Sequence, residues 1–244
     1  MFVTDSDGVG WSIWYDQGYR PDGWFSIHSE TRLAPGAPVT ALWSPDKSGQ
    51  HLDLFGATEA GTVMSIWWDW GEVAGYRPGG WFTIHNETLT GAGGSIVALW
   101  KGNSHLDLFM IGADGTVKSI WFEAGVGYRS DGWFSIAPLI DSQFKPGNHL
   151  TVLWRNDRHL DFFAVAGRQT VWSTWFDTHY GYRPEGWFPI HPELKAQQYA
   201  PTSASWRGSD FLELFVTDPA GQTFTITYDA NDPKDHPDGN SKFG

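Results

Sequence analysis

One tetrapeptide recurs along the whole chain and constrains its fold more than any other feature. Leu-Asp-Leu-Phe at residues 52–55 returns at 106–109, as Leu-Asp-Phe-Phe at 160–163 and as Leu-Glu-Leu-Phe at 212–215. The acidic residues of these four copies lie 54, 54 and then 52 residues apart. A period of this length is typical of a chain built from one stacked or radially arranged unit.

Each repeat contains four short runs of β-branched and aromatic residues, separated by clusters of Gly, Pro, Asn and Asp. In the best-defined repeat these runs span residues 39–43, 51–57, 63–69 and 81–85, and we name them strand positions A, B, C and D. The link from B to C is short and glycine-rich, with Gly61, Gly115 and Gly221 at matching places. This link predicts a hairpin turn that contains a residue at positive φ.

Four antiparallel strands in a repeat of about 54 residues predict an all-β fold, a β-propeller made of four-stranded blades. The chain starts inside one repeat and ends inside another, so we count strands B, C and D, three complete sets, and then A, B and C. We expect these 18 strands to form five blades over residues 1–229, the first and last incomplete. A section of a larger ring, or a ring completed by a second chain, fits the same count. Residues 230–244 are predicted to form a polar, disordered tail.

Composition excludes several classes of function. The 244 residues include 28 acidic and 16 basic side chains, a net charge of −12, whereas nucleic-acid binders carry a basic surface. With no cysteine, the chain has no disulfide, thiolate chemistry or Cys-ligated zinc. It has no apolar run of membrane-spanning length, and its first seven residues lack the basic and apolar parts of a secretory signal. We therefore expect a soluble protein of the cytoplasm, or one exported by a non-classical route.

Strand order predicts that the unusual side chains meet on one rim. Because successive strands run antiparallel, the A–B and C–D loops lie at the same end of each blade. At this end of each blade, an acidic residue lies near the start of strand B and an aromatic residue lies near the end of strand C. The C–D loop carries a Tyr-Arg pair followed by a Trp. A sugar can stack on such a ring and hydrogen-bond the charged groups, so we expect repeated sugar pockets on this rim. The candidate sugar-binding residues are Tyr19, Arg20, Trp24, Asp53, Trp68, Tyr76, Arg77, Trp81, Asp107, Phe122, Tyr128, Arg129, Trp133, Asp161, Phe176, Tyr182, Arg183 and Trp187.

The order of these phrases resembles the β-propeller lectins of fungi and bacteria, including the Aleuria-type fucose lectins and the Psathyrella- and Photorhabdus-type propellers. The resemblance covers residues 1–229 and rests on the order of the repeated phrases. It implies that two polar residues, an Arg on strand B and a Glu on strand C, grip the sugar while two aromatics of the neighbouring blade stack on it. Asp53 stands in place of that Arg and Ser65 in place of that Glu, so the resemblance implies a sugar-binding rim without implying fucose. The aromatic pairs that match are Trp68 with Trp81, Phe122 with Trp133, and Phe176 with Trp187.

Packing is the alternative role for several of these side chains. The tryptophans that open strand D are compatible with both packing and sugar stacking. Arg77 and its counterparts either read sugar hydroxyls or pin the C–D loop, for example by bridging to Asp69 or Asp53. The tryptophans of strands A and C are expected to pack between blades; they are Trp14, Trp43, Trp67, Trp100, Trp121, Trp154 and Trp175.

Three classes of function remain: a multivalent lectin, a protein-interaction platform and a propeller glycoside hydrolase. A glycosidase needs differently tuned carboxylates at one place, whereas the acids here repeat in register. A protein partner would select rim residues that differ between blades, whereas Gly-Tyr-Arg recurs in four repeats. His51 and Asp53 are too few ligands to indicate a metal site. We expect a carbohydrate-binding protein without catalysis or cofactor, specific for neutral or amine-bearing sugars, with a second copy of the chain as a candidate partner that completes the open blades.

Overall fold

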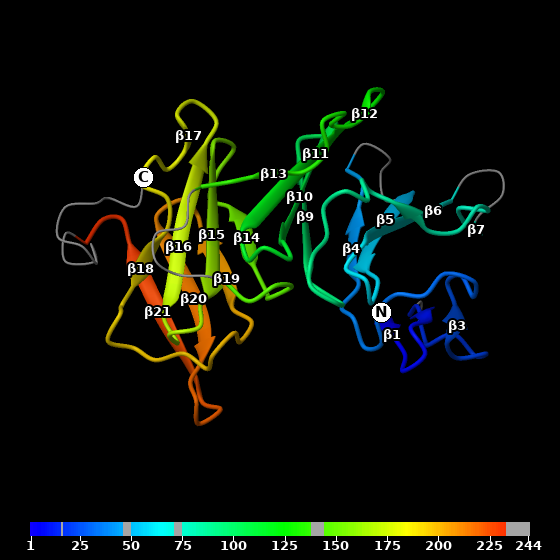
Figure 1. Ribbon diagram of the computed structural model, residues 1–244, viewed down its shortest axis with the longest axis horizontal. Coiled ribbons are helices and arrows are strands. Elements are labelled where there is room, and N and C mark those ends of the chain that lie inside the picture. Colours follow the sequence, from blue (N-terminus) through cyan, green and yellow to red (C-terminus); the bar gives the residue numbers. More distant parts are fainter. Residues whose placement is uncertain (16, 46–49, 71–74, 138–143, 233–244) are drawn as a thin grey trace.

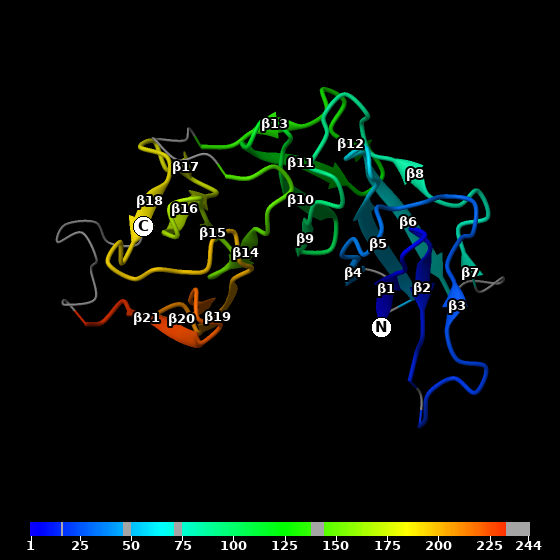
Figure 2. The same ribbon diagram turned by 60° about the horizontal axis from the view of Figure 1, so that its bottom comes forward.

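The computed structural model describes residues 1–15, 17–45, 50–70, 75–137 and 144–232, and within these ranges it contains strands and turns but no helix. The strands form five antiparallel sheets that follow one another along an arc, as the blades of a propeller do (Figure 2). The predicted β-propeller of antiparallel blades is therefore confirmed. The described part of the chain contains no helix long and apolar enough to cross a membrane.

The strand bounds follow the repeat (Figure 1). Blade 1 comprises β1 (Phe2–Thr4), β2 (Gly10–Ser12) and β3 (Phe25–Ser26). Blade 2 comprises β4 (Thr40–Trp43), β5 (His51–Ala57), β6 (Val63–Asp69), β7 (Gly75–Tyr76) and β8 (Phe82–Thr83). Blade 3 comprises β9 (Ile96–Lys101), β10 (His105–Ile111), β11 (Val117–Glu123), β12 (Gly127–Tyr128) and β13 (Phe134–Ser135). Blade 4 comprises β14 (Thr151–Trp154), β15 (His159–Val165), β16 (Val171–Asp177), β17 (Gly181–Tyr182) and β18 (Phe188–Ile190), and blade 5 comprises β19 (Ser203–Arg207), β20 (Phe211–Thr217) and β21 (Thr223–Asp229).

Position D differs from the prediction in blades 2, 3 and 4, where it is divided into two short strands. In blade 2, Tyr76 of β7 pairs with Trp68, and Phe82 of β8 pairs with Ser65, so both pieces lie along β6. The loop between the two pieces leaves the sheet and returns to it. The described residues therefore contain 21 strands where 18 were expected.

The strands at position A form the inner side of the arc. Contacts join β4 to β9, β9 to β14, and β14 to β19, each pair belonging to successive blades. The strands at position D lie on the outer side (Figure 2). Among the described residues blade 1 has no strand at position A and blade 5 has none at position D. These two blades lie apart at the two ends of the arc (Figures 1 and 2).

Alternation along strand B creates the packing between blades. In β5, Leu52 and Leu54 face blade 1, whereas Asp53 and Phe55 face blade 3, because side chains alternate across a strand. The same pattern produces four apolar layers between the five blades. Phe215 of blade 5 has no following blade in this chain and is 39% exposed. Its counterparts, each 0–1% exposed, are Phe55, Phe109 and Phe163.

The turns between strands B and C have the predicted backbone. Gly61, Gly115 and Gly221 have φ angles of 83°, 74° and 82°, in the left-handed region that glycine adopts without strain. The strands end at Asp229. Of the predicted tail at 230–244, residues 233–244 lie outside the described residues, so its disorder stays a prediction.

Candidate functional site

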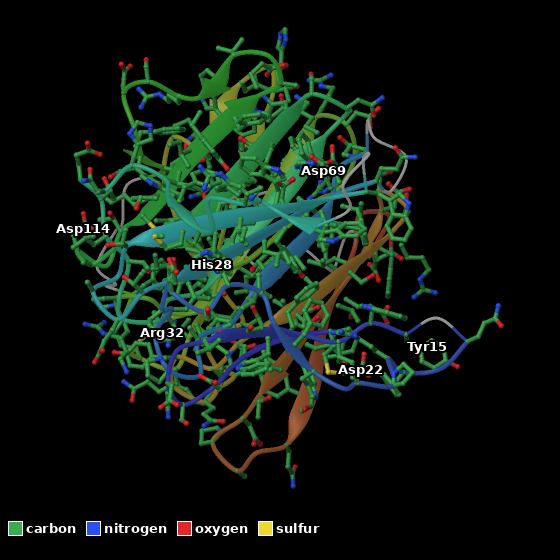
Figure 3. The ribbon with its side chains drawn as sticks, turned by 90° about the vertical axis from the view of Figure 1, so that its right-hand side faces the viewer. Tyr15, Asp22, His28, Arg32, Asp69 and Asp114 are labelled. Carbon is green, nitrogen blue, oxygen red and sulfur yellow. The ribbon has the colours of Figure 1, made fainter. Side chains whose placement is uncertain are left out.

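The two rims of the propeller carry different loops. Asp69, at the end of β6, lies on the same side of the molecule as Tyr15 and Asp22 (Figure 3). Asp114, in the turn between β10 and β11, lies on the opposite side (Figure 3). The A–B and C–D loops therefore share one rim, which is the rim that was expected to bind a ligand.

A cavity of about 380 Å³ opens between blades 2 and 3, and we call it the open pocket. Aromatic side chains form much of its wall. Among the described residues that line it, Asp53 carries the only carboxylate. The side chain of Asp53 is 15% exposed, so a ligand in the cavity can reach it. The residues lining the open pocket are Ser44, His51, Asp53, Trp67, Phe82, Trp100, Leu106, Phe122, Ala124, Gly125 and Tyr128.

Strand register explains why these side chains meet. In blade 2, Asp53 of β5 pairs with Trp67 of β6, and the two side chains therefore point to the same face, toward blade 3. In blade 3, Phe122 of β11 pairs with Tyr128 of β12, and both point back toward blade 2. One blade thus supplies the acid and the next supplies an aromatic wall, which is the arrangement that the repeat predicts.

His51, at the rim end of the same strand, holds Asp53 in place. Its Nε2 lies 3.3 Å from Asp53 Oδ1, its Nδ1 lies 2.9 Å from Asp69 Oδ1, and its ring stacks on Trp67. The hydrogen bond with Asp53, reinforced by Asp69, raises the pKa of His51 above its usual value. The same clamp recurs in blade 3, where the hydrogen bond to Asp107, with a second to Glu123, raises the pKa of His105 to about 9. In these two sites an imidazole between two carboxylates orients the strand-B acid.

The tyrosine of the Gly-Tyr-Arg phrase links neighbouring blades. The hydroxyls of Tyr128 and Ser65 are hydrogen-bonded to each other, and burial raises the pKa of Tyr128, with Asp53 adding to the effect. The equivalent pairs are Tyr76 with Ser12 and Tyr182 with Ser119. Tyr128 and Tyr182 therefore link the acid of one blade to the aromatic wall of the next, whereas Tyr76 links its own blade to the serine of blade 1.

The arginines of the same phrase pin their own loop. Arg77 donates to the carbonyl oxygen of Gly80 at 2.8 Å, and its guanidinium carbon lies 5.2 Å from the ring centres of Trp67 and Phe82. Arg77 therefore interacts with a backbone carbonyl and two aromatic rings, and the expected ion pair with Asp69 or Asp53 is not formed. The counterparts that repeat the carbonyl bond and the aromatic contact are Arg129 on Phe134 and Arg183 on Phe188, while Arg20 lies over Phe25.

The tryptophans divide between packing and the pocket in a way that the sequence did not predict, although Trp100 also packs between blades as expected. Trp81, Trp133 and Trp187 are only 6%, 8% and 2% exposed and belong to the apolar layers, so they offer no face to a sugar. The indole of Trp81 lies against Gly10 of blade 1. Conversely, Trp67 and Trp100, expected to pack between blades, line the open pocket. Trp14 and Trp43 are about half exposed, which also differs from the expected packing role.

The remaining candidates lie at four other positions. Asp107 and Tyr182 meet between blades 3 and 4, where Phe176 also packs against Tyr182. Trp68 and Tyr76 face blade 1. The first residue of β1, Phe2, corresponds to Phe55 of β5, so β1 begins after the place that Asp53 occupies in blade 2 and offers no acid there. Asp161, between blades 4 and 5, is fully buried. On blade 1, the residues Tyr19 and Trp24 are exposed, and no blade precedes them in this chain.

The described ranges contain no group of three or more His, Asp or Glu side chains suited to holding a metal ion. His51 with its two acids forms a hydrogen-bonded clamp, and the geometry offers stacking and hydrogen bonding to a ligand. The side chains that sequence reasoning missed are Trp67 and Trp100. The pairing of Asp53 with Trp67 was the signal for the first, since strand alternation already places both on one face.

No protein-family model matches the sequence, and no curated protein sequence matches it either. Solved structures do match. A lectin of Burkholderia pseudomallei superposes with a TM-score of 0.73 at 17% identity, over 94% of this chain and 62% of that one. The lectin of Aleuria aurantia, a six-bladed β-propeller with a described mode of fucose recognition, superposes with a TM-score of 0.59 at 11% identity, over 94% of this chain and 70% of that one. This chain has the fold of the β-propeller lectins.

A third propeller structure, AofleA of Arthrobotrys oligospora, superposes with a TM-score of 0.63 at 14% identity, over 93% of this chain and 63% of that one. The expected resemblance to the fungal and bacterial propeller lectins is therefore confirmed at the level of the fold. The chain spans 62% of the length of the Burkholderia lectin, and it has five blades where the Aleuria lectin has six.

Proposed function

We propose that the chain is a non-catalytic carbohydrate-binding protein and that the open pocket is a sugar site. The observation that carries this proposal is the position of Asp53, a reachable carboxylate facing the rings of Trp67, Trp100 and Phe122. A sugar can place its C–H face on such rings while its hydroxyls donate to the carboxylate. A cavity of about 380 Å³ falls within the range of small-molecule sites.

The structural neighbours support this function. The Aleuria aurantia lectin is fucose-specific, and another neighbour, SapL1 lectin, was solved in complex with α-methyl fucoside. The polar groups of the open pocket are the carboxylate of Asp53, the imidazole of His51 that is hydrogen-bonded to it, and the hydroxyls of Ser44 and Tyr128, with no arginine among its lining residues. A carboxylate accepts hydrogen bonds and repels anions, so the ligand class that fits is a neutral or amine-bearing sugar. Sialylated and sulfated glycans fit the pocket poorly.

Glycosidase chemistry fits less well. Both retaining and inverting enzymes require two carboxyl groups flanking the scissile bond. Among the described residues that line the open pocket, Asp53 is the sole carboxylate. Asp69 lies behind His51, which is hydrogen-bonded to it.

A glycan array probed with the labelled, metal-free protein, with and without soluble monosaccharide, tests the proposal. We expect selective binding to neutral or amine-bearing terminal sugars that a millimolar monosaccharide abolishes. A blank array from folded protein would contradict the lectin function. It would support the alternative, a protein-interaction platform. A protein partner selects rim residues that differ between blades, and the inter-blade sites do differ.

The exposed face of blade 5 supports self-association. Phe215 is 39% exposed there, whereas the equivalent Phe55 is fully covered by the next blade. We propose that a second copy of the chain covers this face, because large exposed apolar side chains mark interaction sites. Light scattering coupled to size-exclusion chromatography should give the mass of an oligomer that Phe215→Ser dissociates, and the mass of a single chain would contradict the proposal.

A further inference from the structure

Three of the inter-blade sites, those between blades 2 and 3, 3 and 4, and 4 and 5, differ at the residue that follows the last Trp of the A strand. In blades 2 and 4 the backbone N–H of this residue donates to the carbonyl of the histidine that begins strand B, so the position is structurally equivalent. It is Ser44 in blade 2, Lys101 in blade 3 and Arg155 in blade 4. The series runs from a short side chain to a long cationic one.

Arg155 fills the site between blades 4 and 5. Its Nε lies 3.4 Å from Asp161 Oδ2, and its guanidinium carbon lies 4.3 Å from the ring centre of Trp206 on the next blade. Trp206 Nε1 donates to the same Asp161 oxygen at 3.0 Å. The side chains of Arg155 and Asp161 are 9% and 0% exposed, so the acid is closed to any outside ligand.

The open pocket contains the same elements without the guanidinium. Asp53 corresponds to Asp161 and Trp100 corresponds to Trp206, but Ser44 is too short to reach between them. The buried Nε1 of Trp100 has no hydrogen-bond partner among the described residues. Asp53 is 15% exposed where Asp161 is fully buried. The pocket thus offers a ligand the carboxylate and the ring that Arg155 uses within the chain.

In the site between blades 3 and 4, a lysine lies over the tryptophan ring while the acid stays partly exposed. The Nζ of Lys101 lies 5.3 Å from the ring centre of Trp154, the counterpart of Trp100. A lysine covers the ring with a point charge, and its amine lacks the planar fork with which Arg155 engages a carboxylate. Asp107 remains 17% exposed there.

From this series we infer that Arg155 acts as an internal ligand of the site between blades 4 and 5, and that the residue at this position decides which inter-blade sites accept an external ligand. These three sites share a strand-B acid and a tryptophan of the next blade, so this side chain decides whether those two groups are available to an external ligand. That the external ligand is a sugar rests on the proposed function. That the Arg155 guanidinium occupies the site between blades 4 and 5 does not depend on it.

The first test is Ser44→Arg in protein labelled with 5-fluorotryptophan. We expect the new guanidinium to lie over Trp100, shifting its fluorine resonance and weakening monosaccharide binding about tenfold or more, the factor that 1.4 kcal/mol represents. Asn103→Arg, an exposed residue in the β9–β10 turn, adds the same charge to the same rim and should leave both readouts unchanged. An unmoved Trp100 resonance in the Ser44→Arg protein would overturn the inference.

The converse test is Arg155→Ser, with ethylguanidinium as the probe. The probe should shift the fluorine resonance of Trp206 in this variant but not in the unmodified protein. Equal shifts in both proteins, or none in the variant, would overturn the inference. If removing the partner of buried Asp161 prevents folding, the Ser44→Arg arm still decides. If the fluorine resonances shift as expected but no protein, parent or variant, binds sugar, the proposed function is refuted. The role of Arg155 as an internal ligand is then still supported.

Discussion

Ser65 of blade 2 and Tyr128 of blade 3 are hydrogen-bonded across the blade interface, within the electrostatic reach of Asp53. Ser65 is 1% exposed, so its hydroxyl has no access to water. The pair ties the acid of one blade to the aromatic wall of the next. Its recurrence as Tyr76 with Ser12 and Tyr182 with Ser119 makes it part of the repeat, serving blade docking as well as the open pocket.

Tyr128→Phe should lower the free energy of unfolding by about 1–2 kcal/mol, because it leaves the buried Ser65 hydroxyl without its partner. Urea denaturation measures the change. Tyr180→Phe removes the same hydroxyl from a side chain that is 76% exposed and should change stability little. Equal denaturation midpoints for the two variants would show that the bond between blades contributes nothing.

Asp53→Asn should weaken sugar binding by about 2 kcal/mol, or roughly 30-fold, because hydrogen bonds to a charged acceptor are replaced by weaker ones. Isothermal titration calorimetry with the best monosaccharide from the array provides the measurement. The matched control is Glu213→Gln, since Glu213 occupies the equivalent place on blade 5 but no blade in this chain faces it. If the two variants bind alike, the ligand does not use the open pocket.

Trp187→Ala should lower the free energy of unfolding by about 3–5 kcal/mol, the cost of removing a large buried aromatic side chain. Trp187 is 2% exposed and packs against Phe144 at 4.9 Å between ring centres. Trp24 occupies the same place in blade 1 but is 41% exposed, so Trp24→Ala should cost far less. Chemical denaturation of both variants compares them directly, and similar losses would contradict the core role of Trp187.

The fold was predictable because the repeat encodes it twice, through the 54-residue period and through alternation within each strand. Strand order alone placed Asp53 and the aromatics on one rim, and the resemblance to propeller lectins implied that the aromatics belong to the next blade. The roles of the tryptophans did not follow, because burial depends on how the C–D loop turns. Gly80, at φ 66°, is followed by Trp81 in the apolar layer, and sequence periodicity contains no information about that turn.

The inequality of the sites was also beyond sequence reasoning. Ser44, Lys101 and Arg155 lie just outside the recurring phrases, so the repeat drew no attention to them. Their effect depends on side-chain reach across a blade interface, which requires the distance from Arg155 to Asp161 and Trp206. Repetition therefore predicted what the sites share, and the structure shows where they differ.

His105→Gln should remove stability that the unmodified protein has at low pH and loses at high pH. The folded pKa of His105 is raised from 6.5 to about 9. Its stabilisation is therefore complete below pH 6.5 and disappears between pH 6.5 and 9, and we expect about 1 kcal/mol after solvent screening. Thermal unfolding at pH 6 and pH 9.5 should show a difference between variant and parent at the lower pH only.

His51 contributes in the same direction, so the parent protein itself should lose stability over this range. His179→Gln, at an exposed position outside these clamps, is the control and should not change the pH profile. A difference between His105→Gln and parent that is equal at both pH values would mean that the imidazole acts by packing alone.

Gly61→Ala should destabilise the chain much more than Gly221→Ala, although both glycines have φ near 80° in the same turn. A Cβ at Gly61 would lie 2.2 Å from the carbonyl oxygen of Thr90, whereas a Cβ at Gly221 would meet nothing within 4 Å. Each variant incurs about 1 kcal/mol of backbone strain, and Gly61→Ala adds about 2 kcal/mol or more because backbone must move. Urea denaturation separates the two terms, and equal losses would show that the approach of the Thr90 backbone to this turn contributes nothing to stability.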